Sequence, residues 1–323
     1  MAIRKALIVF CSGVVLLSFL LPVTGEAQTL KVTLLGTGTP RPVMDRFGPA
    51  TLVQADKETF LFDCGRGAAQ RLYQLKVPLG QVPNLFLTHL HSDHVNGITD
   101  FWLTGWLALH YAGRKTPLQV WGPPGTKEMM SYLEKAFQAD FRIRVEDEKL
   151  PPEAFPAIAR DIKEGVVYEK NGVKITAFEV DHFPGKDPEL CLGYRIDYAG
   201  RSVVISGDTR FSENLIKFSK GVDVLIYEVA GAKEELLKTS VPTQRIIDHH
   251  TSPEEAGKLF SQVKPKLAVY THFVMVASNT IGPPTVEDFI TMTRKTYPGP
   301  LEAGEDLMAI EIGDTVKVSR PYR

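Results

Sequence analysis

Cysteine is scarce in this sequence, and neither sign of charge is in excess. Only three of the 323 residues are cysteine, and Cys11 lies in an apolar N-terminal run. The other two, Cys64 and Cys191, could form one disulfide at most, which excludes a disulfide-stapled scaffold, and we expect two buried thiols. The formal net charge is −1 and no long basic run occurs. The composition therefore predicts no nucleic-acid partner, because nucleic-acid-binding surfaces normally carry a basic excess.

Short-period repeats and low-complexity tracts are also absent, which excludes a repeat architecture. The sequence does contain enough apolar material for a large core, since 44% of its residues are hydrophobic. A chain of this length and composition can fold as one unit, and we expect a single domain over residues 28–323.

The N-terminal segment has the pattern of a secretory signal peptide. Arg4 and Lys5 precede an apolar run over residues 6–23, and the small residues Gly25 and Ala27 follow at plausible −3 and −1 positions. We therefore expect residues 1–27 to be removed, leaving a periplasmic or secreted protein with no stable membrane partner. The alternative is an uncleaved membrane anchor, because the apolar run is nearly long enough to span a bilayer.

One short segment carries most of the chemical information. It contains three imidazoles and one carboxylate within the six residues His89-Leu90-His91-Ser92-Asp93-His94. Neutral imidazole and carboxylate are ligands that suit zinc and its first-row neighbours. The apolar run just before the cluster, over residues 83–88, predicts a short buried strand. The cluster therefore lies at the C-terminal end of a strand, where ligand crevices form in layered α/β proteins.

Other residues with ligand chemistry lie after predicted strands or just before a predicted helix. They are His182, Asp208, His249, His250 and His272. Each of them alone could equally be a core histidine or a capping aspartate. Their shared positions at the ends of secondary-structure elements favour a common site. His110 is the exception, because it falls within a predicted helix and is interpreted as a structural or rim residue.

The order of the predicted elements is typical of an α/β protein. Strands are predicted over residues 30–35, 50–54, 59–63, 83–88, 119–121, 173–180, 191–198, 202–206, 224–228 and 267–271, and helices over 68–75, 100–112, 126–137, 253–263 and 286–297. Two halves that each run from strands to helices predict two sheets packed face to face, with helices outside. The charged, proline-containing segment 140–165 is predicted to be a loop, either a lid near the site or a solvated surface loop.

These residues resemble the motifs of the metallo-β-lactamase superfamily of binuclear hydrolases. Within it, the resemblance is to the branch that holds ribonuclease Z and the secreted metallo-type arylsulfatases. Residues 62–67 are similar to the family's first motif, whose aspartate, here Asp63, usually organises the site without binding metal. The stretches 45–51 and 103–106 look more like the arylsulfatases. The resemblance covers nearly the whole mature chain and implies a four-layer αββα sandwich.

The resemblance also implies two metal ions per protomer, Zn²⁺ or another divalent transition metal. It assigns His89, His91 and His182 to one ion, Asp93, His94 and His272 to the other, and Asp208 to a bridge between them. The catalytic residues would then be Asp93 and His250, with His250 giving a proton to the leaving oxygen and His249 as its adjacent competitor. Arg210 could contact an anionic substrate or form a surface salt bridge.

Export and the arylsulfatase-like stretches together favour an exported hydrolase of aryl sulfates or related sulfuric or phosphoric esters. Its substrate would be a small anionic ester, and it could form a homodimer. A phosphodiesterase of ribonuclease Z type is the alternative, but the 26 residues between His182 and Asp208 leave no room for a tRNA-binding arm at that point. A lactonase or β-lactamase activity stays open, and a non-catalytic binding module is disfavoured by the complete ligand set.

Overall fold

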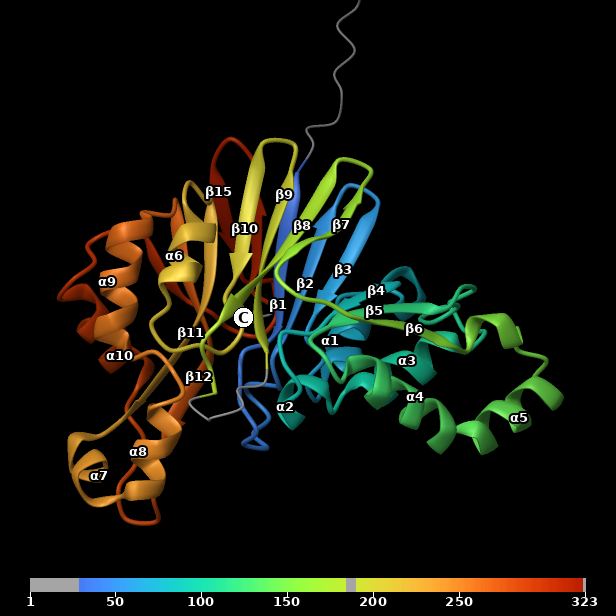
Figure 1. Cartoon of the computed structure of the whole chain (residues 1–323), viewed down its shortest axis with the longest axis horizontal. Helices are drawn as coiled ribbons and strands as arrows, with labels where there is room; N and C mark the ends of the chain where they lie inside the picture. Colours follow the sequence, from blue (N-terminus) through green and yellow to red (C-terminus); the bar gives the residue numbers. More distant parts are fainter. Residues whose placement is uncertain (1–28, 184–189, 322–323) are drawn as a thin grey trace, which may run out of the picture.

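Two β-sheets packed face to face form the centre of the protein (Figure 1). The computed structural model describes residues 29–183 and 190–321. Within these residues, the strands of the first sheet lie in the order β15 (Val316–Ser319), β14 (Ala309–Ile312), β1 (Leu30–Gly36), β2 (Ala50–Ala55), β3 (Glu58–Phe62), β4 (Asn84–Phe86), β5 (Leu118–Gly122) and β6 (Ala157–Asp161). The second sheet has the order β13 (Leu301–Ala303), β12 (Leu267–Val276), β11 (Val224–Ala232), β10 (Arg201–Ile205), β9 (Cys191–Tyr198), β8 (Val173–Val180) and β7 (Gly165–Lys170).

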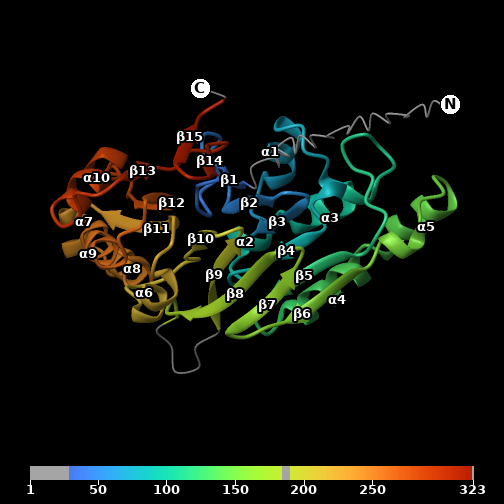
Figure 2. The ribbon, with the colours of Figure 1, turned by 90° about the horizontal axis from the view of Figure 1, so that it is seen from above.

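Helices flank both sheets. They are α1 (Ala68–Gln74), α2 (Ser92–Val95), α3 (Ile98–Trp106), α4 (Thr126–Ala136), α5 (Gln138–Glu146), α6 (Glu213–Ser219), α7 (Glu234–Thr239), α8 (Val241–Ile247), α9 (Pro253–Val263) and α10 (Val286–Arg294), with 3₁₀ turns at Leu79–Gln81 and Pro152–Ala154. Seen from above, α1, α3 and α4 lie beyond one sheet and α6, α9 and α10 beyond the other (Figure 2). This arrangement confirms the predicted αββα sandwich.

Three apolar clusters follow from these layers. The central cluster lies between the sheets, where Phe86 stacks on Trp121 with ring centroids 4.6 Å apart. A second cluster lies beneath α1 and α3 and includes the buried Trp102. A third lies beneath α6, α9 and α10 and includes Phe260. Burial of apolar surface on both faces of each sheet is the main stabilising contribution to such a fold.

At the start of α9, local sequence signals were sufficient to predict where the helix begins. Ser252 caps the helix by accepting the N–H of Glu255, and the Glu255 carboxylate accepts the N–H of Ser252 in return. Pro253 occupies the first helical position, where its missing N–H has no helical partner to lose. The predicted helix over 253–263 is therefore confirmed with the same bounds.

Several predicted segments differ from the structure, and two of them bear on the interpretation of the sequence. The helix predicted over 100–112 ends at Trp106, so His110 lies in the turn beyond it and is exposed. The loop predicted over 140–165 instead contains most of α5, the 3₁₀ turn Pro152–Ala154 and the edge strand β6. β6 is an edge strand that pairs only with β5, and none of its residues is fully buried. It therefore lacks the apolar pattern from which buried strands are predicted.

The N-terminal prediction lies outside the described residues. Residues 1–27, where we expect a signal peptide, and with them the boundary of the domain at residue 28, stay a prediction. Among the residues that the structure describes, no helix is long and apolar enough to cross a membrane.

Candidate metal centre

The predicted metal ligands meet at one edge of the sandwich, although they come from segments far apart in sequence. The turn after β4 and helix α2 carry four of them, and the turns after β8 and β10 carry one each. The last, His272, lies within β12. The full set is His89, His91, Asp93, His94, His182, Asp208 and His272.

His272 is aimed by an irregularity in its strand. Glu228 of β11 pairs with Thr271 and Val229 pairs with Phe273, so His272 is an extra residue in β12. Its φ of 43° lies in the left-handed region, which is uncommon for a residue other than glycine. A β-bulge of this kind redirects a side chain. Here Nε2 of His272 lies 3.1 Å from Nε2 of His94.

The ligand atoms form two groups, each with all atoms within 4.8 Å of one another. One group is His89, His91, His182 and Asp208, and the other is Asp93, His94 and His272. Oδ2 of Asp208 lies between them, 3.1 Å from His272 Nε2, 3.4 Å from His94 Nε2 and 3.8 Å from the Nε2 atoms of His89 and His182. The family resemblance likewise separates His89, His91 and His182 from Asp93, His94 and His272, and the assignment of metal ions to these groups stays a prediction.

The chemistry of these atoms fits metal ions. Nδ1 of His91 lies 3.0 Å from His89 Nε2 and 3.2 Å from His182 Nε2, so three imidazole nitrogens converge on one point. A neutral imidazole has one N–H and one lone pair, so hydrogen bonds cannot satisfy three converging nitrogens well. Oδ1 of Asp208 is buried and has no hydrogen-bond partner among the described residues. A cation at each group would use these lone pairs.

The imidazoles of the two groups differ in their pKa values. Burial lowers the pKa of His182 to about 4 and that of His89 well below its ordinary value. Burial also opposes charge on His272, but the adjacent Asp208 outweighs it and raises the pKa of His272 to about 10. The pKa of His94 is raised in the same way, by Asp208 and Asp63. Burial thus disfavours a proton on His89 and His182, whereas the neighbouring carboxylates of Asp208 and Asp63 favour one on His272 and His94.

Asp63 organises the loops that carry the ligands, as the resemblance implies. Its carboxylate accepts the N–H of Thr88 at 2.8 Å and the Thr88 hydroxyl at 2.9 Å. Oδ2 of Asp63 also lies 2.8 Å from Nδ1 of His94, which leaves His94 Nε2 directed at Asp208. A carboxylate behind a ligand histidine fixes its tautomer and its ring orientation.

His250 stands beside the metal groups and has a partner that the sequence analysis missed. Its Nδ1 lies 3.2 Å from Oε1 of Glu228, a fully buried carboxylate in β11. Burial alone would lower the pKa of His250, but Glu228 raises it above its ordinary value. The sequence feature that could have indicated this partner is the single acidic residue, Glu228, within the otherwise apolar run 224–230. His249 instead accepts the N–H of His182 Nδ1 through its backbone carbonyl, at 2.8 Å.

A cavity of about 320 Å³ gives access to these residues. Its polar side consists of metal-group residues together with His249 and His250. Its other walls are the loop residues Thr39, Pro40 and Arg41, Ile246 of α8, and the end of β12 from Val274 to Val276. The cavity can thus hold a group about the size of one nucleotide or one aryl ester against the metal groups.

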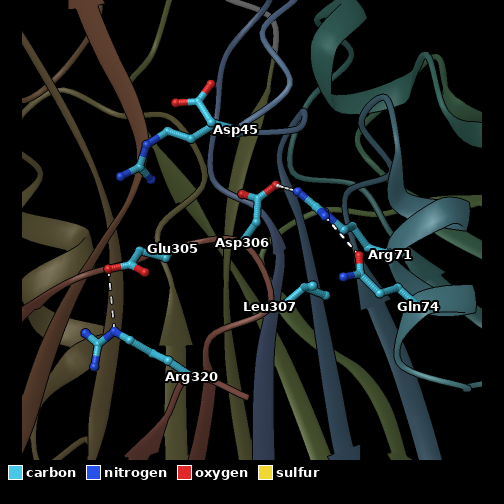
Figure 3. Close-up of a pocket in the computed structure, with 8 residues that line it drawn as sticks. Asp45, Arg71, Gln74, Glu305, Asp306, Leu307 and Arg320 are labelled. Atoms are coloured by element: carbon cyan, nitrogen blue, oxygen red, sulfur yellow. Dashed lines mark hydrogen bonds and ion pairs between the residues drawn. The ribbon is translucent and has the colours of Figure 1, made fainter. Parts of the chain in front are cut away.

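Asp306 holds the loop that forms one wall of this cavity. Oδ1 of Asp306 accepts the N–H and the hydroxyl of Thr37, both at 2.9 Å, and Oδ2 accepts the N–H of Phe47 at 2.8 Å. Arg71 donates to Oδ2 at 2.9 Å, within a polar pocket of about 330 Å³ (Figure 3). Asp306 therefore ties down both ends of the loop 37–47, whose other side faces the metal groups.

Replacing Asp306 with Asn should weaken substrate binding more than it slows the chemical step. The amide loses the ion pair with Arg71 and one acceptor position, so the loop 37–47 is less well fixed. We expect KM to rise about tenfold with little change in kcat, because one charge-assisted hydrogen bond is lost. Steady-state kinetics and metal analysis would measure this, with the exposed Asp314→Asn as the matched control. Loss of metal with an unchanged KM would contradict the assigned role.

Comparisons with known proteins agree with this geometry. The family description "Beta-lactamase superfamily domain" matches residues 58–273. Ribonuclease Z from Mycolicibacterium gilvum is 35% identical over 289 residues, covering 88% of this chain and 96% of that protein. Ribonuclease Z from Mycobacterium bovis is also 35% identical, covering 88% and 98%.

Solved structures share the fold at lower identity. The metallo-β-lactamase fold protein YhfI from Bacillus subtilis matches with a TM-score of 0.68 and 18% identity, over 88% of this chain and 100% of that one. The short form of human tRNase Z matches with a TM-score of 0.64 and 20% identity, over 87% and 98%.

These relatives overturn two expectations from the sequence. The assignment to exported arylsulfatases is wrong, because relatives 35% identical over most of the chain are ribonuclease Z proteins. The stretches 45–51 and 103–106 were too short to decide between branches. The expected absence of a nucleic-acid partner is contradicted by the same relatives. Net charge is a sum over the whole chain, and it does not report local clusters of charge of the kind that contact RNA.

The match over residues 58–273 and the ribonuclease Z relatives show that the chain belongs to the metallo-β-lactamase superfamily.

Proposed function

We propose that this protein is a metal-dependent phosphodiesterase that hydrolyses RNA. The observation that carries the proposal is that residues of both His/Asp groups border one cavity together with His250, which Glu228 contacts from behind, in a chain 35% identical to ribonuclease Z proteins. Phosphodiester hydrolysis needs an activated water, stabilisation of charge on the phosphoryl oxygens, and a proton for the leaving oxygen. The site has residues suited to each requirement.

Two divalent ions fit the ligand groups. His89, His91 and His182 would hold one ion, Asp93, His94 and His272 the other, and Asp208 would be shared. Nitrogen and oxygen ligands in these numbers favour zinc. When bound, two such ions would lower the pKa of the attacking water and neutralise negative charge on the phosphoryl group.

His250 serves the leaving group in this proposal. The oxygen of water bonds to phosphorus, one proton of that water passes to solvent, and the ester P–O bond breaks. The leaving oxygen keeps the bonding electron pair and takes a proton from His250. Because Nδ1 of His250 faces Glu228, Nε2 is the nitrogen that remains for the substrate. Glu228 also favours the protonated imidazole, which is the form that can donate.

The substrate class is tested by comparing an RNA with a sulfate ester. We expect a precursor tRNA with an extended 3′ end, and the small diester bis(p-nitrophenyl) phosphate, to be hydrolysed. Hydrolysis should stop with a chelator and return with Zn²⁺. Labelled RNA on a gel and nitrophenolate release would measure the rates. Faster hydrolysis of p-nitrophenyl sulfate than of both phosphodiesters would overturn the proposal.

Acidification should remove the two ions in a defined order. Ligands must lose their protons to bind a metal ion. The raised pKa values of His94 and His272 make protons compete for their group, whereas His89 and His182 are already neutral. Below neutral pH, affinity for the Asp93–His94–His272 group should fall roughly tenfold per pH unit for each proton displaced. Zinc titration of the chelator-treated protein from pH 8 to pH 6 would show it, and equal pH dependence of both ions would contradict it.

A further inference from the structure

A second cavity adjoins the metal cavity, and His249 and His250 line both. This second cavity, here called the arginine cavity, has a volume of about 490 Å³. Its other lining residues are Arg210, Phe211, Arg245, Ile247, Asp248, Ser252 and Glu255. The imidazole of His250 therefore stands at the boundary, with the metal groups on one side and two arginines on the other.

Both arginines have N–H groups without a hydrogen-bond partner among the described residues. Arg245 lies on α8, is exposed, and makes no hydrogen bond or ion pair with any residue in 29–183 or 190–321. Arg210 follows the bridging Asp208 by two residues. Its Nη2 donates to both carboxylate oxygens of Asp181, at 2.6 and 2.7 Å, but its buried Nε has no partner among the described residues. Guanidinium groups in this position suit a phosphate, which accepts two parallel hydrogen bonds.

The remaining walls suit a nucleoside. Phe211 offers a partly buried aromatic ring and Ile247 an apolar side chain, and bases bind by stacking on such surfaces. Two acids also line the cavity. The carboxylate of Glu255 is already engaged by the N–H and hydroxyl of Ser252, and Asp248 is exposed at the end of α8. Neither acid pairs with Arg245, so its charge stays available.

We propose that the arginine cavity binds the nucleoside that leaves during hydrolysis, and that Arg245 and Arg210 bind a further phosphate carried by that nucleoside. The proposal rests on the phosphodiesterase function. It follows from the place of His250, because a residue that protonates the leaving oxygen must lie between the scissile phosphate and the leaving group. With the scissile phosphate in the metal cavity, the leaving group extends past His250 into the arginine cavity.

The test uses three diadenosine substrates with the same scissile bond: ApA, pApA and ApAp. The products of ApA identify the leaving nucleoside. Adenosine plus adenosine 5′-monophosphate form if the 3′ oxygen leaves, and adenosine 3′-monophosphate plus adenosine form if the 5′ oxygen leaves. We expect a terminal phosphate on the leaving nucleoside to raise kcat/KM about tenfold over ApA, because charge-assisted hydrogen bonds are gained.

Variants show whether the arginines cause this preference. Arg245→Ala, an exposed substitution, and Arg210→Gln should each remove most of the gain in kcat/KM from the terminal phosphate. Arg142→Ala, at an exposed position on α5, is the matched control and should keep the full gain. An unchanged gain in both cavity variants, a gain only from the phosphate on the retained nucleoside, or no gain in the unmodified protein would each overturn the proposal.

A binding measurement tests the arginine cavity independently of the proposed phosphodiesterase function. If bis(p-nitrophenyl) phosphate is not hydrolysed, the proposed function fails, and if it is hydrolysed but no diadenosine is cleaved, only the substrate range narrows. In both cases, calorimetry with the nucleotide that the leaving nucleoside would form, adenosine 5′-monophosphate or adenosine 3′-monophosphate, decides about the cavity. About tenfold weaker binding of either nucleotide to Arg245→Ala, with adenosine itself unaffected, supports the proposal. Equal binding of both nucleotides by the unmodified and variant proteins overturns it.

Discussion

Replacing Asp208 with Asn is expected to remove at least one of the two metal ions and to lower phosphodiesterase activity by about a thousandfold or more, since metal ions contribute several kcal/mol to such a transition state. Oδ2 of Asp208 lies within 3.8 Å of four imidazole nitrogens that belong to both ligand groups. An amide has no negative charge with which to hold two cations together. Loss of the Asp208 carboxylate also removes the negative charge that raises the pKa of His272.

Metal analysis by mass spectrometry, together with activity at saturating zinc, would measure the effect. Asp223→Asn is a matched control, because Asp223 is also a buried carboxylate, in the bend just before β11. It accepts the N–H of Ser202 at 2.7 Å and pairs with Lys266, at the start of β10 and β11 and away from the ligands. It should lower stability and keep the metals. Full metal content and activity in Asp208→Asn would refute the proposed bridge.

Replacing His250 with Ala is expected to slow hydrolysis by about 10²–10⁴, the usual range for a general acid, while the metals and the fold remain. The loss should be largest for substrates with basic leaving groups such as a ribose hydroxyl. It should shrink for nitrophenolate, which leaves without a proton. His249→Ala should be milder, because the contact of His249 with His182 uses its backbone carbonyl. A loss that ignores the leaving group would make His250 a binding residue instead.

The pH dependence of the same step depends on Glu228. Burial alone would lower the pKa of His250, and Glu228 outweighs this and raises it. Proton donation needs the protonated imidazole, so activity is present below the pKa of His250 and is lost as pH rises through it. Glu228→Gln should therefore move the descending alkaline limb of the kcat profile to lower pH. Profiles measured with an RNA substrate would show this shift, and an unmoved limb would remove Glu228 from the mechanism.

The proposed substrate class, RNA, was not evident from the sequence. The signal-peptide pattern and two short stretches favoured a small ester, whereas whole-chain charge and the 26 residues between His182 and Asp208 argued against RNA. Recognition of a nucleic acid depends on which charged and aromatic side chains meet on one surface, and the two arginines of the proposed arginine cavity, Arg210 and Arg245, are 35 positions apart in the chain. Whole-chain sums cannot contain that information.

The sequence by itself determined the fold class, and it picked out the histidines and aspartates that the fold brings together as candidate metal ligands. These candidates could be found because four of them lie within six residues, and because His182 and Asp208 follow apolar runs that form strands. Strand ends of a layered α/β fold converge, so residues at those ends meet without any knowledge of the detailed packing. The Ser252 capping box was equally local, since its hydrogen bonds join residues three apart.

Only the tertiary structure decided which side chains support those ligands. Glu228 reaches His250 because β11 passes beside the turn before α9, and Asp306 reaches Thr37 across 269 positions of the chain. His272 is aimed by a bulge that exists only in the pairing of β11 with β12. Such contacts arise from the packing of elements that are distant in sequence. No local pattern of apolar and polar residues specifies them, because each partner alone has the composition of an ordinary strand or loop.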